Sequence, residues 1–329
     1  MGDTDPLPVE QPDIAYLAGL VDQAAAANRL FVRNTPLWRA PWLDGPRCRT
    51  WLKLENLQHT GSFKVRGATN FLVRNRGRIG DFVVTASTGN HGAAVAFSAS
   101  RLGVGARVFV PESTSTTKLV AMEILGAQIR KVGADAVESE LAARRDAAEH
   151  GYPYVSPYND LDVIAGQGTI ATELLEALHP VDVAVVAVGG GGLIAGVASR
   201  LRAANPRTRI VAASPEASSV MAASLQAGRI VDQVSRPTLS DATAGGIEPG
   251  AVTFEHCRAL IDDFQLVTED EIALGVRDLV FRQRVVGEGS AGCAVAGFRR
   301  VLHTVVGNVV VIVCGGNIAP QTLAAVVAG

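Results

Sequence analysis

The hydrophobic positions of this chain fall into short continuous runs that alternate with alanine-rich stretches. Continuous runs of valine and isoleucine are typical of parallel strands that are covered on both faces. The apolar runs predict strands at residues 82–85, 106–110, 128–132, 183–188, 210–213 and 308–313. The stretches between them predict helices at residues 90–101, 118–125, 134–150, 167–178 and 193–204.

Strands that alternate with helices indicate an α/β chain. The unit of strand, glycine turn and helix occurs at residues 85–92 and again at 188–196. We therefore expect two α/β lobes with a cleft between them, which is the usual place for a cofactor.

Composition narrows the class of protein. The 329 residues are 48% hydrophobic and 19% charged, which is typical of a globular chain. A formal net charge of -2 does not favour a nucleic-acid or membrane partner. Residues 1–6 are acidic and do not resemble a secretion signal. The cysteines form no CxxC pair, so we expect neither a zinc site nor a disulfide framework but a reducing, cytoplasmic setting. They are Cys48, Cys257, Cys293 and Cys314.

Lys64 is the first candidate for chemistry. It follows a small, flexible Thr60-Gly61-Ser62 approach, has Phe63 beside it, and is followed by the small residues Gly67 and Ala68. Desolvation in such surroundings would lower the pKa of the amine and make a nucleophile available near neutral pH. The alternative is a solvated lysine at a helix start, which two glycine loops further along the chain disfavour.

The run Gly189 to Gly192 follows a predicted strand and opens a predicted helix. Without side chains, its backbone N–H groups can close around an anion, and the helix dipole favours a negative charge there. A phosphate is therefore the expected guest. Gly190-x-Gly192-x-x-Ala195 also matches the dinucleotide fingerprint, with Glu216 as a candidate ribose-binding acid, so a nicotinamide oxidoreductase stays open at this point.

Two further loops are polar and rich in glycine. Residues 87–92, Ser-Thr-Gly-Asn-His-Gly, stand at a helix start and would suit a carboxylate. Residues 314–317, Cys-Gly-Gly-Asn, follow the last predicted strand, where Cys314 is either a cleft residue or a buried structural cysteine. His91 is either a ligand-binding residue or an ordinary packing histidine.

Four motifs in this order resemble the threonine/serine dehydratase group of fold-type II pyridoxal phosphate (PLP) enzymes. They are residues 53–64, residues 87–92, the run Gly189 to Gly192 and residues 314–317. The resemblance implies two open, twisted, mostly parallel sheets of the tryptophan synthase β type. It implies a large PLP-binding domain of residues 1–75 and 155–329, a small domain of residues 76–154, and a homodimer.

The resemblance also implies how the cofactor is held. Lys64 looks like the Schiff-base lysine, with Phe63 packed beside the cofactor ring. Asn90 would bind the phenolic oxygen, Cys314 would face the pyridine nitrogen, and Glu288 matches a family glutamate near the cofactor. The phosphate would be held by the backbone N–H groups of Gly189, Gly190, Gly191, Gly192 and Leu193.

The substrate would be a small β-hydroxy amino acid of the threonine or serine type, bound by Ser87, Thr88, Asn90 and His91. Lys64 would act as the base that removes the α-proton, and Thr88 is placed with it among the catalytic residues. The products would be a 2-oxo acid and ammonia. A β-replacement synthase that uses the same aminoacrylate intermediate is the alternative, followed by an amino-acid racemase.

Departures from the family pattern refine these expectations. Thr88 stands where serine racemases carry a serine, which makes racemisation less favourable. Ser214-Pro215-Glu216 and Val220 replace the residues that bind a divalent metal in relatives, so we expect no metal there. Asp241-Ala242 replaces the usual Asp-Gly, and residues 245–250 look most like the hydroxyectoine-utilisation dehydratase subgroup, which widens the choice of substrate.

Overall fold

The computed structural model describes residues 12–329, apart from the side chain of Thr117. The interpretation of residues 1–6 as no secretion signal therefore lies outside the described residues. The strands are β1 (Leu37–Arg39), β2 (Cys48–Leu54), β3 (Phe82–Ala86), β4 (Gly105–Val110), β5 (Ala127–Lys131), β6 (Val183–Ala187), β7 (Arg209–Pro215), β8 (Asp263–Val267) and β9 (Gly307–Val313). The helices are α1 (Ile14–Asn28), α2 (Lys64–Arg74), α3 (Asn90–Arg101), α4 (Thr116–Ile124), α5 (Ala136–His150), α6 (Leu161–Ala177), α7 (Gly192–Ala204), α8 (Val220–Ala227), α9 (Val252–Leu260), α10 (Glu269–Asp278), α11 (Gly289–Val301) and α12 (Pro320–Ala328). Shorter turns of helix are η1 (Pro41–Leu43), η2 (Glu55–Leu57), η3 (Asp241–Thr243) and the π-helical η4 (Leu279–Gln283).

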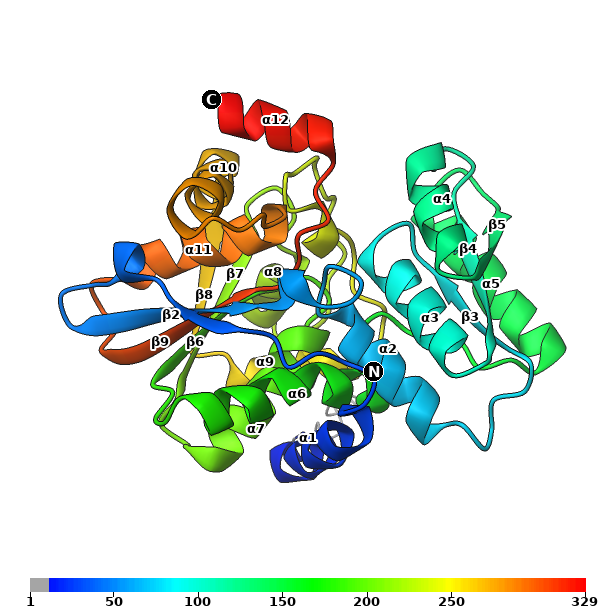
Figure 1. The fold of residues 1–329 in the computed structure, drawn as a ribbon, viewed down its shortest axis with the longest axis horizontal. Helices are drawn as coiled ribbons and strands as arrows, with labels where there is room; N and C mark the ends of the chain where they lie inside the picture. Colours follow the sequence, from blue (N-terminus) through cyan, green and yellow to red (C-terminus); the bar gives the residue numbers. More distant parts are fainter. Residues whose placement is uncertain (1–11) are drawn as a thin grey trace, which may run out of the picture.

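The strands form two separate sheets. A six-stranded sheet has the order β1-β2-β9-β6-β7-β8, and a three-stranded sheet has the order β3-β4-β5. Every pairing is parallel except that of β1 with β2. Figure 1 shows the sheets in two lobes, with α2 lying between them. The expected α/β class, with mostly parallel sheets flanked by helices, is confirmed.

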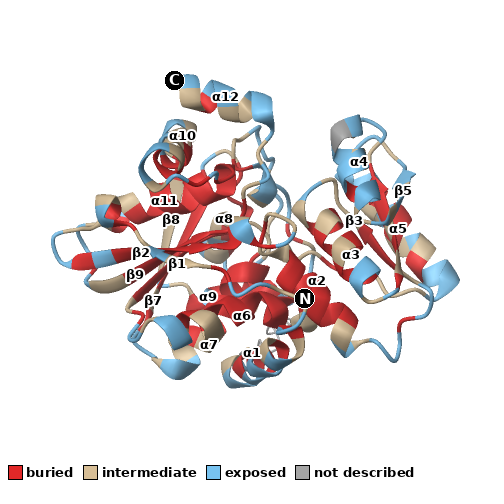
Figure 2. Cartoon of the chain, viewed as in Figure 1, coloured by how far each residue is buried: buried red, intermediate tan, exposed pale blue. Residues whose placement is uncertain are grey.

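The larger sheet is covered on both faces. Helix α11 packs against β6, β7, β8 and β9, and α10 lies against α11. Helices α1, α6 and α7 pack together on the opposite face (Figure 1). All five residues of β6 are buried as a result, as Figure 2 shows for the centre of this lobe. A strand covered on both faces has no polar side, which is why its sequence is a continuous apolar run.

We call residues 82–150, with the smaller sheet and α3, α4 and α5, the small lobe. Helix α5 begins at the capping residue Asp135, whose side chain accepts a hydrogen bond from the Glu138 N–H. It ends before Gly151, which adopts the left-handed conformation that favours glycine. Arg144 lies in the middle of this helix.

The helix predicted over residues 167–178 begins six residues earlier, at Leu161. Asp160 caps it by accepting a hydrogen bond from the Val163 N–H. Gly166 and Gly168 lie inside this helix, although glycine is a poor helix former. They are required because a Cβ at Gly166 would lie 2.5 Å from the Arg66 carbonyl, and one at Gly168 would lie 2.8 Å from the Gly196 carbonyl.

Candidate active site

Lys64 is the first residue of α2, and the chain before it is fixed to the end of β9. The Phe63 N–H donates to the Cys314 carbonyl over 3.0 Å, and Ser62 forms an antiparallel bridge with Gly315. Gly61 has a φ of +72°, and a Cβ on it would lie 2.5 Å from Asn317 Oδ1. The Thr-Gly-Ser approach to the lysine therefore allows the turn to pack closely against the residues after β9.

The amine of Lys64 lies in a partly buried position between the lobes. Its Nζ donates to the Pro157 carbonyl over 2.8 Å and lies 5.2 Å from the centre of the Phe63 ring. Burial lowers the pKa of Lys64 to about 8, although Cys314 and Glu288 favour the charged amine. The surroundings of Lys64 thus lower its pKa through burial, and its role as a nucleophile stays a prediction.

The glycine run lies at the start of α7, directly after β6. Gly191 has a φ of +88°, and a Cβ there would lie 2.8 Å from Cys257 Sγ. A Cβ on Gly189 would lie 2.7 Å from the Thr243 carbonyl. These contacts show why side chains are excluded from the turn. Gly192 begins α7 and Leu193 follows it, so their N–H groups belong to the first turn of the helix, where an anion is favoured.

Tyr158 joins the lysine to the glycine turn, and sequence reasoning missed it. It follows Pro157, the partner of Lys64, and a Cβ on Gly190 would lie 2.5 Å from the Tyr158 ring. Its hydroxyl accepts a hydrogen bond from the Glu248 N–H over 2.9 Å, and burial raises its pKa to about 12. No strand, helix or glycine signal marks residues 153–160, so only the fold could reveal this contact.

Glu288 is the centre of a buried hydrogen-bonded cluster. Its carboxylate accepts bonds from Asn90 Nδ2 at 3.0 and 3.1 Å, from the Asn317 N–H at 3.1 Å and from Ser290 Oγ at 2.7 Å. Burial raises the pKa of Glu288. Cys314 Sγ donates in turn to Ser290 Oγ over 3.1 Å, and burial raises the pKa of this thiol to about 12. The structure thus brings together Asn90, Glu288 and Cys314, with Cys314 joined to Glu288 through Ser290, a residue that the sequence analysis did not single out.

The loop between β3 and α3 carries the remaining predicted residues. Ser87 and Thr88 are half-buried at the end of β3, and Ser87 Oγ accepts a bond from the Gly89 N–H over 3.2 Å. His91 is buried, and its Nε2 is 2.9 Å from the Val155 carbonyl. Burial lowers the pKa of His91. Its imidazole is therefore neutral and already bound through one nitrogen.

Two other chemistries find no support in the described residues. Within residues 12–329, no group of three His, Cys, Asp or Glu side chains is arranged to hold a metal ion. Glu216, the candidate ribose-binding acid, is 49% exposed, and its carboxylate lies 3.8 Å from Arg300 on α11.

No helix in the described part of the chain has both the length and the apolar character that a membrane crossing requires.

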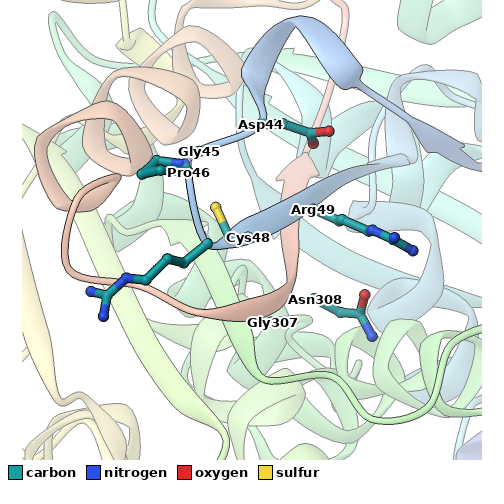
Figure 3. A pocket seen from close by; sticks show the side chains of 8 residues that line it. Asp44, Gly45, Pro46, Cys48, Arg49, Gly307 and Asn308 are labelled. Atoms are coloured by element: carbon teal, nitrogen blue, oxygen red, sulfur yellow. The ribbon is translucent and has the colours of Figure 1, made fainter.

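A surface hollow of about 580 Å³ lies elsewhere, between the starts of β2 and β9. Figure 3 shows its lining residues, with Arg49 and Asn308 at one side and Asp44 above. Ligands of parallel α/β sheets bind beyond the carboxyl ends of the strands, and this hollow is at the opposite ends. It is separate from the Lys64 site.

The Lys64 site fits pyridoxal phosphate. It combines an amine that can condense with an aldehyde and a glycine turn that can receive a phosphate. Two buried hydroxyl oxygens in the chain segment that leads to the lysine, Ser62 Oγ and Thr60 Oγ1, have no hydrogen-bond partner within the described residues. Unpartnered buried oxygens next to a reactive group are expected where a polar ligand completes the site.

Comparison with known proteins gives the same picture. Residues 29–315 match the family described as pyridoxal-phosphate dependent enzyme. The chain is 41% identical to an L-threonine ammonia-lyase of Geobacter sulfurreducens over 84% of this chain and 69% of that protein. Its fold superimposes on the processed form of threonine deaminase isoform 2 from Solanum lycopersicum with a TM-score of 0.90, at 31% identity, covering 96% and 94% of the two chains. Maize serine racemase gives a TM-score of 0.88 at 30% identity, covering 94% and 95%.

Proposed function

This chain belongs to the pyridoxal-phosphate dependent enzyme family, and from that membership we propose that it removes water from a small β-hydroxy amino acid of the threonine or serine type. The products are a 2-oxo acid and ammonia. The observation that carries the proposal is the Lys64 amine, which donates to the carbonyl of Pro157, the neighbour of Tyr158 at the glycine turn, and whose pKa burial lowers to about 8. Similarity to an L-threonine ammonia-lyase and a threonine deaminase supports the same reaction.

The cofactor would be held by Lys64, by Phe63 and by the glycine turn of Gly189 to Gly192, which we call the phosphate turn. When bound, pyridoxal phosphate condenses with an amine and withdraws electrons from the α-carbon of the attached amino acid. Lys64 would take the α-proton, because an amine with a pKa of about 8 is partly neutral near physiological pH. The Pro157 carbonyl, 2.8 Å from Nζ, orients the amine.

Asn90 and Cys314 would bind the cofactor ring, and the Glu288 cluster fixes their positions. Asn90 donates to Glu288 through Nδ2 and accepts from Asn317 Nδ2 through Oδ1, over 2.7 Å. Its amide is thus held on both sides. The Cys314 thiol stays neutral because burial raises its pKa to about 12. A neutral thiol cannot keep a ring nitrogen protonated as a carboxylate would, which favours prompt loss of a β-substituent over reactions that need a long-lived carbanion.

The loop between β3 and α3 would bind the substrate carboxylate. Ser87, Thr88, Asn90 and His91 all lie at the start of α3 or just before it, where N–H groups and the helix dipole favour an anion. Thr88 would also act on the face of the substrate opposite Lys64. Its β-branched side chain has fewer accessible rotamers than serine, which disfavours a reprotonation step from that side and hence racemisation.

The test is to incubate the PLP-loaded protein with L-threonine or L-serine alone, and to measure ammonia and 2-oxo acid. We expect equal amounts of both products, and no D-amino acid. A requirement for an added thiol or amine would instead assign a β-replacement synthase. Turnover that persists at the wild-type rate in Lys64→Ala would exclude the proposed base.

Further parts of the proposal rest on the family. The larger sheet with residues 1–75 and 155–329, and the smaller sheet with residues 76–154, would be the two domains. A cytoplasmic setting fits the four cysteines, which are free thiols, and a homodimer is proposed from the family resemblance. Size-exclusion chromatography with light scattering tests the subunit count.

A further inference from the structure

Residues 239–250, which include the short helical turn η3, lie between α8 and α9 in the sequence and contact both the start of α11 and the phosphate turn. Leu239 lies against the start of α11, where a Cβ on Gly289 would approach the Leu239 carbonyl closer than any real contact. Thr243 lies against the phosphate turn, because a Cβ on Gly189 would be 2.7 Å from its carbonyl. We call residues 239–250 the rim segment.

The rim segment also reaches the small lobe. Glu248 Oε2 accepts a hydrogen bond from Arg144 Nη2 over 2.8 Å. Two other contacts fix the side chain of Arg144: its guanidinium lies 4.3 Å from the centre of the Tyr154 ring, and it donates to Glu140 one turn earlier on α5. An arginine stacked on a ring loses little further freedom when it pairs with a carboxylate. The ion pair therefore joins an element of the small lobe to the edge of the larger one.

Glu248 passes this contact on to the phosphate turn. Its N–H donates to the Tyr158 hydroxyl over 2.9 Å; the Tyr158 ring packs against Gly190, and the Tyr158 Cα and Cβ lie against Gly192. The same residue thus binds the small lobe through its side chain and the tyrosine of the phosphate turn through its backbone.

Glycines flank the residues that make these contacts. Gly245 has a φ of +129° and Gly250 a φ of +73°, and a Cβ on Gly245, Gly246 or Gly250 would meet no atom within 4 Å. Ile247 between them is only 8% exposed. Residues 247–249 therefore lie between glycines with open space beside their α-carbons, and a few specific contacts hold the segment in place: the burial of Ile247, the Glu248 ion pair and the hydrogen bond from the Gly245 N–H to Ser218 Oγ.

We propose that Arg144 and Glu248 form a clamp between the lobes, which holds the rim segment closed and presses Tyr158 against the phosphate turn. Arg144 is then a positioning residue that acts on the cofactor through Glu248 and Tyr158. The clamp follows from contacts between the lobes and does not depend on which reaction the cleft performs.

Hydrogen–deuterium exchange, read by mass spectrometry on peptides that cover residues 240–250, tests the clamp in the PLP-loaded protein. The variants are Arg144→Gln, Glu248→Gln, the double variant, and the charge exchange Arg144→Glu with Glu248→Arg. Arg145→Gln is the matched control, because Arg145 is the exposed neighbour on the same helix. Circular dichroism establishes that each variant is folded, and fluorescence titration gives its affinity for PLP.

Arg144 and Glu248 are 40% and 28% exposed, so we expect a modest effect, about two- to five-fold faster exchange in either single variant. PLP affinity should fall by a similar factor. Exchange in the double variant should be no faster than in a single variant, and the charge exchange should recover part of the lost protection and PLP affinity. Raising the salt concentration to about 1 M, where the Debye length is about 3 Å, should raise the exchange rate of the wild type to that of Arg144→Gln. Exchange in Arg144→Gln equal to that in Arg145→Gln, or additive effects in the double variant, would overturn the proposal.

Discussion

The substitution Gly190→Ala tests the phosphate turn most directly. A Cβ at this position would lie 2.5, 2.6 and 2.8 Å from three carbons of the Tyr158 ring. Ordinary van der Waals contacts of a Cβ begin at about 3.4 Å, so the ring must move by several tenths of an ångström. It cannot do so freely, because the Glu248 N–H holds its hydroxyl at 2.9 Å. Forcing an extra methyl group into a packed site costs about 1–3 kcal/mol.

If that strain distorts the turn, the affinity for PLP should fall by about 5- to 150-fold, since about 1.4 kcal/mol corresponds to tenfold. Absorbance or fluorescence titration of the cofactor-free protein measures it. Gly77→Ala is the control, because Gly77 is exposed and a Cβ there meets nothing within 4 Å. In a Tyr158→Ala background the penalty of Gly190→Ala should shrink. Unchanged PLP affinity in Gly190→Ala would refute the role assigned to the turn.

Three further predictions follow from the charged groups. Burial lowers the pKa of Lys64 to about 8, so below pH 8 the folded protein carries a buried charge that costs stability. The cofactor-free Lys64→Met variant should therefore melt at a higher temperature than the wild type at pH 7. This difference in melting temperature should shrink as the pH rises from 8 to about 10.5, the range in which only the unfolded lysine is still protonated. Arg66→Ala should lower the free energy of unfolding by about 3–5 kcal/mol in urea titrations, because it leaves the buried Glu55 carboxylate, 2.7 Å from the arginine, without its partner. Glu288→Gln should cost about 1–3 kcal/mol in the same assay, since whichever oxygen is replaced by an NH2 group would face the donor Asn90 Nδ2, which bonds both carboxylate oxygens. A stability equal to wild type would mean that Glu288 is already protonated.

The strand and helix pattern was predictable wherever a valine-rich run stood beside a regular helix. Helix α3 matches its predicted residues, and β6 and α7 each differ from theirs by one residue at one end. Prediction was poorer where tertiary contacts decide the conformation. The glycines inside α6 signal irregular structure locally, yet they exist to let α2 and α7 approach closely.

The candidate site divides in the same way. Lys64 and the Gly189 to Gly192 turn carry strong local signals, because their chemistry needs unusual neighbours in the sequence. Tyr158 and Ser290 carry none. A tyrosine after a proline and a serine in a small-residue helix are ordinary, and only the packing of β6, α11 and the rim segment gives them partners.

The account depends on Lys64 being the residue that bonds to the cofactor. Borohydride reduction of the PLP-loaded protein, followed by proteolysis and mass spectrometry, identifies the modified lysine. We predict a single labelled peptide, modified at Lys64, and no label in the Lys64→Ala variant. Labelling at another lysine, such as the buried Lys53, with Lys64 unmodified, would contradict the central claim.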